Sequence, residues 1–388
     1  MPSEKSKIIS GLCEKYIFEV VMADSSDEDN EEETTEMFLM HMANLLGNRR
    51  SVHFGVPKSE KWQQNVLKEF DDERFNQMVR VRPEEFFYIL DLIKDDEVFK
   101  TSSSTAQLPV EMQLKIVLYR LGSYGDGLSI RKVATLFGVG DGGTIQIVTD
   151  RVFKAILNLK KRFLFWPNSR ERSEILYATK DEMPGCIGYI DGSEIKLAEA
   201  PVKNHELFFS RKRQYAIKVQ AVCDYKLRIR QLTVGYPGSV HDAKIFSNCP
   251  IAKHHERFVS PPQWIAGDSA YPLKSFLLTP FRTNSIEHTK EERVLYNKHF
   301  SKYRVRIENC FGILKEKFSS LKELKLRMMS DKNKMLCNDW IIVCGILHNI
   351  LIDFNAENKS EILIPEINLP PESNTRSGLL QFIQIQNV

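Results

Sequence analysis

Three apolar segments of the sequence end in an aspartate. Asp191 ends "CIGYID", Asp224 ends "YAIKVQAVCD" and Asp268 ends "PPQWIAGD". A single aspartate at such a place is an ordinary turn residue, particularly before a glycine. Three aspartates at the ends of strands in one sheet predict carboxylates that project from a common edge. Because such a cluster is repulsive without a cation, the pattern favours a metal site.

The side chains indicate which metal would bind. Carboxylate oxygens are the ligands that Mg²⁺ and Mn²⁺ prefer. Two further acids are candidates: Asp242 after "GYPGSVH", and Glu308 beside the apolar stripe of "YRVRIENCFGILKEKF". We predict that Asp191, Asp268 and Glu308 converge on one site, and that Gly192 lets the chain turn directly after the first acid.

Basic residues surround the candidate acids. Residues 293–327 contain ten Lys/Arg and three acids. Arg304 and Lys315 share a helical face with Glu308, where they could neutralise the phosphates of a phosphodiester substrate. A second basic cluster lies among aromatic residues, a combination that suits nucleic acid, and consists of Arg211, Lys212 and Arg213. The alternatives are a solvated helix and a charged hairpin tip.

The region before these motifs has a helical pattern over 59–165. "LSIRKVATLFG" and "TIQIVTDRVFKAILNL" predict two helices with a Gly-containing turn between them. This arrangement is a helix-turn-helix candidate for DNA binding, with an ordinary helical hairpin as the alternative. Only Gln146 and Thr149 of the second helix are plausible base readers.

The catalytic candidates lie in a region with a different pattern. Short apolar strands come first and helices follow, which predicts an α/β layered domain over 185–355 with helices covering a mixed sheet. Residues 166–184 are expected to be a linker and 356–388 a polar tail. The apolar segment 340–354 is too short and too polar to span a bilayer, and so predicts a buried helix.

The charge of the chain is unevenly distributed. Its 388 residues include 54 Lys+Arg and 51 Asp+Glu, but the stretch 24–36 in the N-terminal segment 1–58 holds eight acids and no base. The acidic stretch is predicted to be disordered. The remainder carries +11, which fits either a polyanionic partner or a solvated basic surface.

Cysteine usage and the N-terminus indicate the compartment. The seven cysteines form no C-x-x-C pair and most lie in apolar runs. This argues for a reducing compartment and against a zinc ribbon. The N-terminus has no apolar signal-peptide region. We therefore expect a soluble intracellular protein with no membrane partner.

Several motifs occur in the order found in PIF/Harbinger-type DDE transposases and the Harbinger transposase-derived nuclease. They are "IDGSEIKL", "YAIKVQAVCD", "VGYPGSVHDAKIF", "AGDSAYP", "YNKHFSKYRVRIENCFGILKEKF" and "VCGILHNI". The chain resembles this family, which implies a ribonuclease-H-like catalytic core that follows the helix-turn-helix-like region in the sequence. The family's DDE triad then corresponds to Asp191, Asp268 and Glu308. Asp224 and Asp242 match other acidic positions of the family and are implied as extra metal ligands.

The resemblance covers about 185–352 and has further implications. It implies a nuclear location, without excluding the cytoplasm, and a separate Myb-like partner that helps with DNA binding or import. Self-association into a homo-oligomer is left open. Family members often show Asn-Arg-Lys-Gly where this chain has "SRKR". Ser210 and Arg213 replace the Asn and the Gly, which puts the local hairpin in question.

The sequence thus predicts a metal-dependent DNA endonuclease or transposase. Two divalent cations would activate water and stabilise the leaving oxygen. Asp191 would bridge the two cations, and Asp268 and Glu308 would each coordinate one of them. Strand transfer would reuse the site with a DNA 3′-hydroxyl. The alternative is a catalytically silent DNA-binding or chromatin adaptor. A helical phosphohydrolase site at His241–Asp242 is disfavoured by the adjacent Pro-Gly turn.

Overall fold

A computed structural model describes most of the chain. The described residues are 9–17, 35–42, 69–100, 107–140, 143–356 and 374–386. The chain divides into two compact units, Met1–Pro57 and Lys58–Val388. The candidate site lies entirely in the second unit.

The described part of the first unit consists of two helices, 9–17 and 35–42. The rings of Tyr16 and Phe38 stack with their centroids 4.2 Å apart, which joins the two helices. The last two residues of the predicted disordered stretch belong to the second helix. The rest of that stretch lies outside the described residues.

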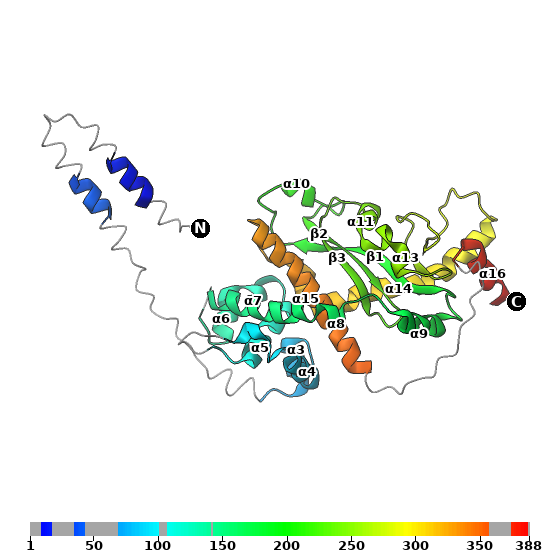
Figure 1. The fold of residues 1–388 in the computed structure, drawn as a ribbon, viewed down its shortest axis with the longest axis horizontal. Coiled ribbons are helices and arrows are strands. Elements are labelled where there is room, and N and C mark those ends of the chain that lie inside the picture. The colour runs from blue at the N-terminus through cyan, green and yellow to red at the C-terminus, as the bar shows by residue number, and fades with distance from the viewer. Residues whose placement is uncertain are drawn as a thin grey trace. The chain divides into compact units, whose positions relative to one another are not determined.

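The second unit is built on a six-stranded mixed sheet with the strand order β3-β2-β1-β4-β5 (Figure 1). Its strands are β1 (Cys186–Leu197), β2 (Ala216–Cys223), β3 (Ile229–Pro237), β4 (Trp264–Ala266), β5 (Leu277–Leu278) and β6 (Glu323–Leu324). β1–β2 and β2–β3 are antiparallel pairs, whereas β1–β4, β4–β5 and β1–β6 are parallel. The predicted α/β domain with a mixed sheet is confirmed.

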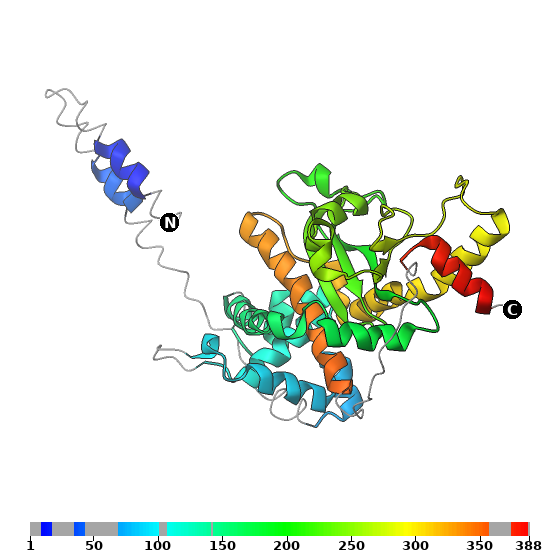
Figure 2. The same cartoon turned by 45° about the vertical axis from the view of Figure 1, so that its right-hand side comes forward.

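Helices cover both faces of this sheet (Figures 1 and 2). α14 (Lys290–Lys317) contacts β1 and β2, and α15 (Asp331–Ala356) contacts β3. Alternate residues of β1 point to opposite faces, so Tyr189 joins the apolar cluster under α14 and α15. Ile190 joins a second cluster, which is covered by α9 (Ser169–Thr179) and α11 (Asp242–Asn248). A mixed sheet between helices is consistent with a ribonuclease-H-like core.

Shorter elements complete the unit. The helical region contains α3 (Asp72–Val79), α4 (Pro83–Ile93), η2 (Glu97–Phe99), α5 (Val110–Gly122), η3 (Gly125–Leu128), α6 (Ile130–Leu136), α7 (Gly143–Asn158) and α8 (Lys160–Phe163). The sheet region adds α9 (Ser169–Thr179), α10 (His205–Phe208), α11 (Asp242–Asn248), α12 (Pro250–Lys253), α13 (His255–Phe258), η4 (Ser319–Leu321) and α16 (Arg376–Gln386).

The two helices predicted for the helix-turn-helix candidate are present as α6 and α7. Gly138, in the left-handed conformation at φ 60°, follows the end of α6. Thr149 cannot read bases, because its side chain is buried and donates a hydrogen bond to the Ile145 carbonyl at 2.7 Å. α7 packs against α5 and α15, so it belongs to the same compact unit as the sheet.

Residues 169–179 form α9 where a linker was expected. Asn168 and Glu171 make a capping box at its start. Ile175 and Leu176 are buried against the sheet, and the other residues keep the segment polar enough to resemble a linker in sequence.

The predicted buried helix at 340–354 is confirmed as the C-terminal part of α15. By length and composition α15 could cross a membrane, but 67% of its most apolar stretch is buried within the protein. Asn349, which interrupts that stretch, uses its side chain to join elements. It donates to the carbonyls of Phe163 (2.8 Å) and Ile229 (2.7 Å) and accepts from the Ile229 N–H (2.9 Å).

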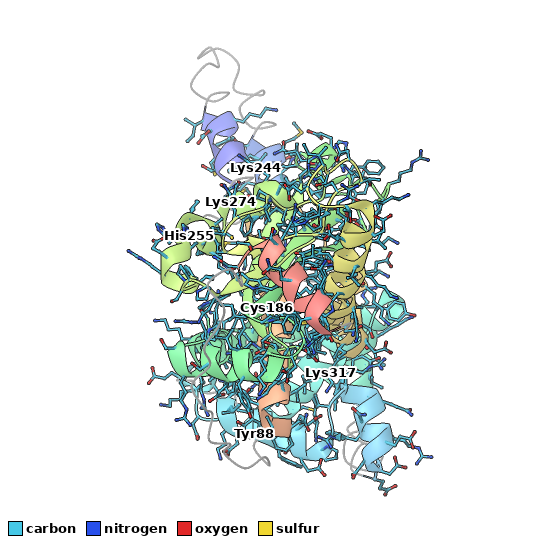
Figure 3. All side chains as sticks on the ribbon, turned by 90° about the vertical axis from the view of Figure 1, so that its right-hand side faces the viewer. Tyr88, Cys186, Lys244, His255, Lys274 and Lys317 are labelled. Atoms are coloured by element: carbon cyan, nitrogen blue, oxygen red, sulfur yellow. The ribbon has the colours of Figure 1, made fainter. Side chains whose placement is uncertain are left out.

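α16 forms within the tail for which only a polar character was predicted. It lies against α14 (Figure 3). Arg376 donates to the carbonyls of Thr279 (2.9 Å) and Pro280 (3.0 Å) and covers the Phe281 ring at 4.5 Å. These contacts anchor the helix together with the buried side chains of Leu379, Leu380 and Ile383.

A buried ion pair fixes the turn between β2 and β3. Only 1% of the Asp224 side chain is exposed, and it accepts from Arg230 Nε at 2.8 Å and from the N–H groups of Lys226 (2.8 Å) and Arg228 (3.1 Å). Arg230 also pairs with Glu171 at 2.9 Å, which ties the turn to α9.

Asp224→Ala is therefore expected to lower the free energy of unfolding by about 3–5 kcal/mol, because it leaves a buried guanidinium short of its partner. Urea unfolding of the full-length protein measures this change. Asp91→Ala removes an exposed pair with Lys94 and should cost less than about 1 kcal/mol. Equal, small losses for both variants would contradict the structural role of Asp224.

Candidate active site

Asp191 lies in the middle of β1. The strand runs on to Leu197, and Gly192 continues the ladder with β2, so the predicted turn after the acid is wrong. β4, however, ends at Ala266, which pairs with Tyr189. Asp191 therefore lies where β1 loses its neighbour on one side, and this places the carboxylate at an open edge.

Asp268 occupies the matching position beyond β4. It follows Ala266 by two residues, just as Asp191 follows Tyr189 by two residues. Because the strands are parallel and side chains alternate, the two carboxylates leave the same face of the sheet near each other. The loop after Asp268 is held by its Oδ1, which accepts from the Ala270 N–H at 2.9 Å.

Gly192 is explained by a close approach of Asp242, the first residue of α11. A Cβ atom on residue 192 would lie 2.6 Å from Asp242 Cγ. Any side chain at this position would push the Asp242 carboxylate away from β1. The glycine therefore makes room for a third acid beside Asp191 instead of bending the strand.

The surroundings of the Asp191 carboxyl disfavour its charged form. Burial raises the pKa of Asp191 to about 6; the Gly192 N–H, at 2.7 Å from Oδ1, and Arg304 lower it, whereas Asp268 and Asp242 raise it. The charged form is thus disfavoured by low solvation and by neighbouring acids. A divalent cation would relieve both effects.

Tyr271, which the sequence analysis did not select, lies among the same acids. Burial, followed by the charges of Asp191, Asp242 and Asp268, raises the pKa of Tyr271 well above its usual value. Its hydroxyl accepts from Gln220 Nε2 at 3.0 Å, so its proton remains available to a carboxylate. In the sequence, its position three residues after Asp268 is the signal that could have identified Tyr271 as part of the site.

Glu308 reaches the other acids through an arginine. It is half-exposed on α14, and Arg304 lies one helical turn before it. Arg304 Nη1 is 3.3 Å from Asp191 Oδ2, and Nη2 pairs with Glu308 Oε1. One guanidinium therefore links the two carboxylates that were predicted to share a metal site.

The carboxylates of this cluster are candidate metal ligands. Within the described ranges, no three Asp, Glu, His or Cys side chains are close enough to hold a metal ion together. The donors are nevertheless hard carboxylates, and those of Asp191, Asp242 and Asp268 repel one another. The donor set suits Mg²⁺ or Mn²⁺ chemically, and Arg304 occupies the position between Asp191 and Glu308 that a cation would share.

Asp224 does not belong to this cluster. β2 runs antiparallel to β1, and Cys223 at its end pairs with Tyr189, before Asp191 is reached. Asp224 consequently lies toward the start of β1, and its side chain is engaged by Arg230. The expectation that all three strand acids share one edge is wrong for Asp224, because it assumed one strand direction.

Two predicted phosphate-binding cations are engaged within the protein. Arg304 pairs with the acids as described. Lys315 Nζ donates to Ser193 Oγ (2.9 Å) and to the Glu194 carbonyl (2.8 Å), and burial lowers the pKa of Lys315 to about 8. Lys315 therefore fixes α14 to β1.

The other basic cluster is exposed on a turn. The side chains of Arg211 and Lys212 face solvent, and Arg213 adopts φ 57°, the left-handed region that glycine favours. Ser210 Oγ donates to Glu194 Oε2 at 2.9 Å and accepts from the Lys212 N–H at 3.2 Å. The hairpin is thus formed despite the two replacements.

Lys218 is a second residue that the sequence analysis missed. It lies in β2 with its Nζ 3.4 Å from both Glu194 Oε1 and Asp242 Oδ1. In the sequence, a lysine within a largely apolar strand indicates that its charge is paired with an acid. Lys218 thus pairs with the Asp242 carboxylate that approaches Gly192.

Known proteins resemble this chain. The human protein named "Putative nuclease HARBI1" is 26% identical over 314 residues, which cover 79% of this chain and 85% of that protein. The Arabidopsis thaliana protein Antagonist of like heterochromatin protein 1 is 28% identical over 304 residues, covering 73% and 74%. No solved structure gives a significant match.

A family model gives the class of the domain. Residues 190–349 match the model described as DDE superfamily endonuclease. The matched span contains Asp191, Asp242, Asp268 and Glu308, and it extends from β1 to α15. The family prediction is confirmed, and residues 190–349 form a DDE superfamily endonuclease domain.

Proposed function

We propose that this protein is a divalent-metal-dependent DNA endonuclease of the Harbinger transposase-derived type. The observation that carries the proposal is the gathering of Asp191, Asp242 and Asp268 at the open edge of β1, with Glu308 linked to them through Arg304. The family match supports the same class of reaction.

The acids would hold the metal. Asp191, Asp268 and Glu308 would be its ligands, with Asp242 as an additional ligand. When bound, the metal ions activate the attacking water and stabilise the leaving oxygen of the phosphodiester.

Other residues of the chain hold these acids in place. Tyr271 keeps its proton and can orient a carboxylate by donating to it, while Gln220 fixes the tyrosine hydroxyl. Lys218 positions Asp242, and Lys315 fixes α14 and thereby Glu308 against β1. Arg304 must leave the acids when metal binds, and its guanidinium would then be free to bind a phosphate.

The proposal also includes the substrate, the cellular location and the partners. DNA would be the substrate, with the exposed Arg211, Lys212 and Arg213 as phosphate contacts and the α6–α7 hairpin as a second contact region. Strand transfer would use a DNA 3′-hydroxyl at the same acids. A nuclear location and a Myb-like helper protein follow from the resemblance to the Harbinger family.

A catalytically silent DNA-binding or chromatin adaptor is the second candidate. Arg304 favours it, because the guanidinium fills the space between Asp191 and Glu308. The name of the Arabidopsis relative, an antagonist of a heterochromatin protein, also points to chromatin. A nicking assay separates the two functions.

Asp191→Asn is expected to abolish Mg²⁺-dependent nicking of supercoiled DNA while duplex binding stays equal or becomes slightly tighter. The amide keeps the size of the side chain but lacks the charge that holds a dication and repels phosphates. Gel assays and fluorescence anisotropy measure the two effects. Asp91→Asn, on the exposed surface of α4, is the control and should keep full activity.

Nicking by the Asp191→Asn variant at the wild-type rate would remove this residue from the mechanism. A wild-type protein that binds DNA but never nicks it in Mg²⁺ or Mn²⁺ would favour the adaptor.

Gly192→Ala is expected to reduce nicking on the order of 100-fold, because the new Cβ displaces Asp242 from the acid cluster. Initial rates at saturating Mg²⁺ measure this loss. The matched control is Gly11→Ala in the helix 9–17 of the first unit, where a Cβ meets no atom within 4 Å. Equal activity of both variants would show that the position of Asp242 is unimportant.

Arg304→Gln is expected to tighten Mn²⁺ binding by roughly tenfold in the absence of DNA, because a unit charge a few Å from the ion is removed. Isothermal titration calorimetry measures the affinity directly. Lys298→Gln, an exposed position on the same helix, should leave the affinity unchanged. Weaker Mn²⁺ binding by Arg304→Gln would show that the guanidinium supports the metal site instead of competing with it.

A further inference from the structure

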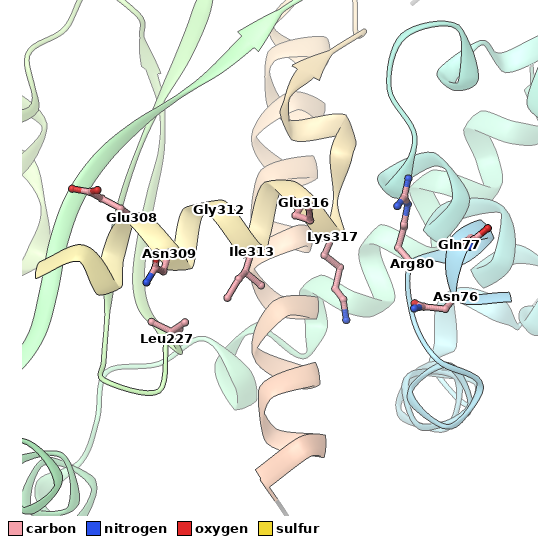
Figure 4. A pocket seen from close by; sticks show the side chains of 10 residues that line it. All are labelled: Asn76, Gln77, Arg80, Leu227, Glu308, Asn309, Gly312, Ile313, Glu316 and Lys317. Carbon is pink, nitrogen blue, oxygen red and sulfur yellow. The ribbon is translucent and has the colours of Figure 1, made fainter. Parts of the chain in front are cut away.

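A groove of about 650 Å³ lies between α3 and α14 (Figure 4). Its volume is within the range of roughly 300–1,000 Å³ that is typical of ligand sites. The wall carries three amide side chains, two cationic ones and two acidic ones: Asn76, Gln77 and Asn309, Arg80 and Lys317, and Glu308 and Glu316. Most of the remaining surface of the groove is apolar, so these polar groups are set in an apolar wall.

The groove begins at the candidate acids. Glu308, which Arg304 links to Asp191, is also part of the groove lining. In Figure 4, Glu308 leaves α14 on the side opposite Asn309 and Lys317. A polymer whose backbone passes the acids can therefore continue over α14 into the groove.

Gly312 lies in the floor of the groove, within the long helix α14. Glycine destabilises a helix interior relative to alanine. A Cβ on Gly312 would meet no atom within 4 Å, so the packing of the protein does not require this glycine. A ligand that approaches the helix backbone closely would require it.

The side chains around Gly312 suit unpaired nucleotides. Neither the Asn76 nor the Asn309 amide makes a hydrogen bond with any residue in the part of the chain that the structure describes. Amides present donors and acceptors together, as base edges do. Ile313 is 46% exposed and offers an apolar surface to a base. Two cations lie further along: Lys317, which pairs with Glu85 at 3.7 Å, and Arg80, whose Nε donates to the Gly122 carbonyl at 3.2 Å. Their remaining N–H groups can contact a phosphate.

We propose that this groove holds a short unpaired stretch of the DNA strand next to the phosphodiester that the acids cleave. Bases reach amide and apolar side chains in this way only when they are unstacked from a duplex. The proposal rests on the proposed function, because it uses the acids to define where the strand comes from. It adds that α3, in the helical region, contacts the substrate beside the cleavage site.

The test uses the metal-free, full-length protein, so that binding is measured without cleavage. Fluorescence anisotropy follows a short labelled single-stranded oligonucleotide. Gly312→Leu should weaken binding at least about tenfold, because the side chain enters the groove from a position where a Cβ meets no protein atom. Gly11→Leu is the matched control: it is another helical glycine whose Cβ meets nothing, it lies in the first unit, and the substitution should leave binding unchanged.

A second variant keeps the test decisive if Gly312→Leu does not fold. Asn309→Ala adds no bulk, and it should reduce the difference in affinity among oligonucleotides of different base composition. Unfolding temperatures near that of the wild type establish that both variants are folded. Gly312→Ala should raise this temperature, since alanine favours the helix.

The outcomes separate the two proposals. If the wild type does not bind single strands, or if Gly312→Leu and Asn309→Ala bind them as the wild type does, the groove proposal is overturned, and a peptide becomes the better occupant. Magnesium-dependent nicking by the wild type would in that case leave the proposed function intact. Loss of single-strand binding in Gly312→Leu, with no nicking by the wild type, would support the groove and overturn the nuclease.

Discussion

The unequal lengths of β1 and β4 determine the candidate site. β1 is paired with β2 along most of its length, whereas its parallel partner β4 stops at Ala266. The resulting open edge lets carboxylates from both faces of the sheet approach one strand. Repulsion among these acids then requires the compensating cations of the structure, Arg304 beside Asp191 and Lys218 beside Asp242.

The sequence was sufficient for properties that depend on local pattern. An apolar run before an aspartate predicted the position of Asp268 just after β4, and the periodicity of α14 placed Glu308 beside its apolar stripe. The same pattern placed Asp191 at the end of a strand that in fact continues to Leu197. Strand direction and register are long-range properties that a single strand does not reveal. For that reason the role of Gly192 and the position of Asp224 were both predicted incorrectly.

Polar residues were the least predictable part of the fold. Lys315 and Arg304 have the sequence pattern of phosphate-binding side chains, yet both make contacts within the protein. α9 was predicted as a linker because only its buried side carries apolar residues. Whether a polar side chain bonds inward or faces solvent depends on neighbours that are distant in sequence, as Asn349 shows.

The bonds made by Asn349 determine how the protein can be divided. Its amide joins α15 to the end of α8 and to β3, while α7 packs on the same helix. Cutting the chain between α8 and the sheet would leave this buried amide without one acceptor and would expose apolar surface of α15 to water. The helical region and the sheet are therefore one cooperative folding unit, and neither is a module that could be transplanted alone.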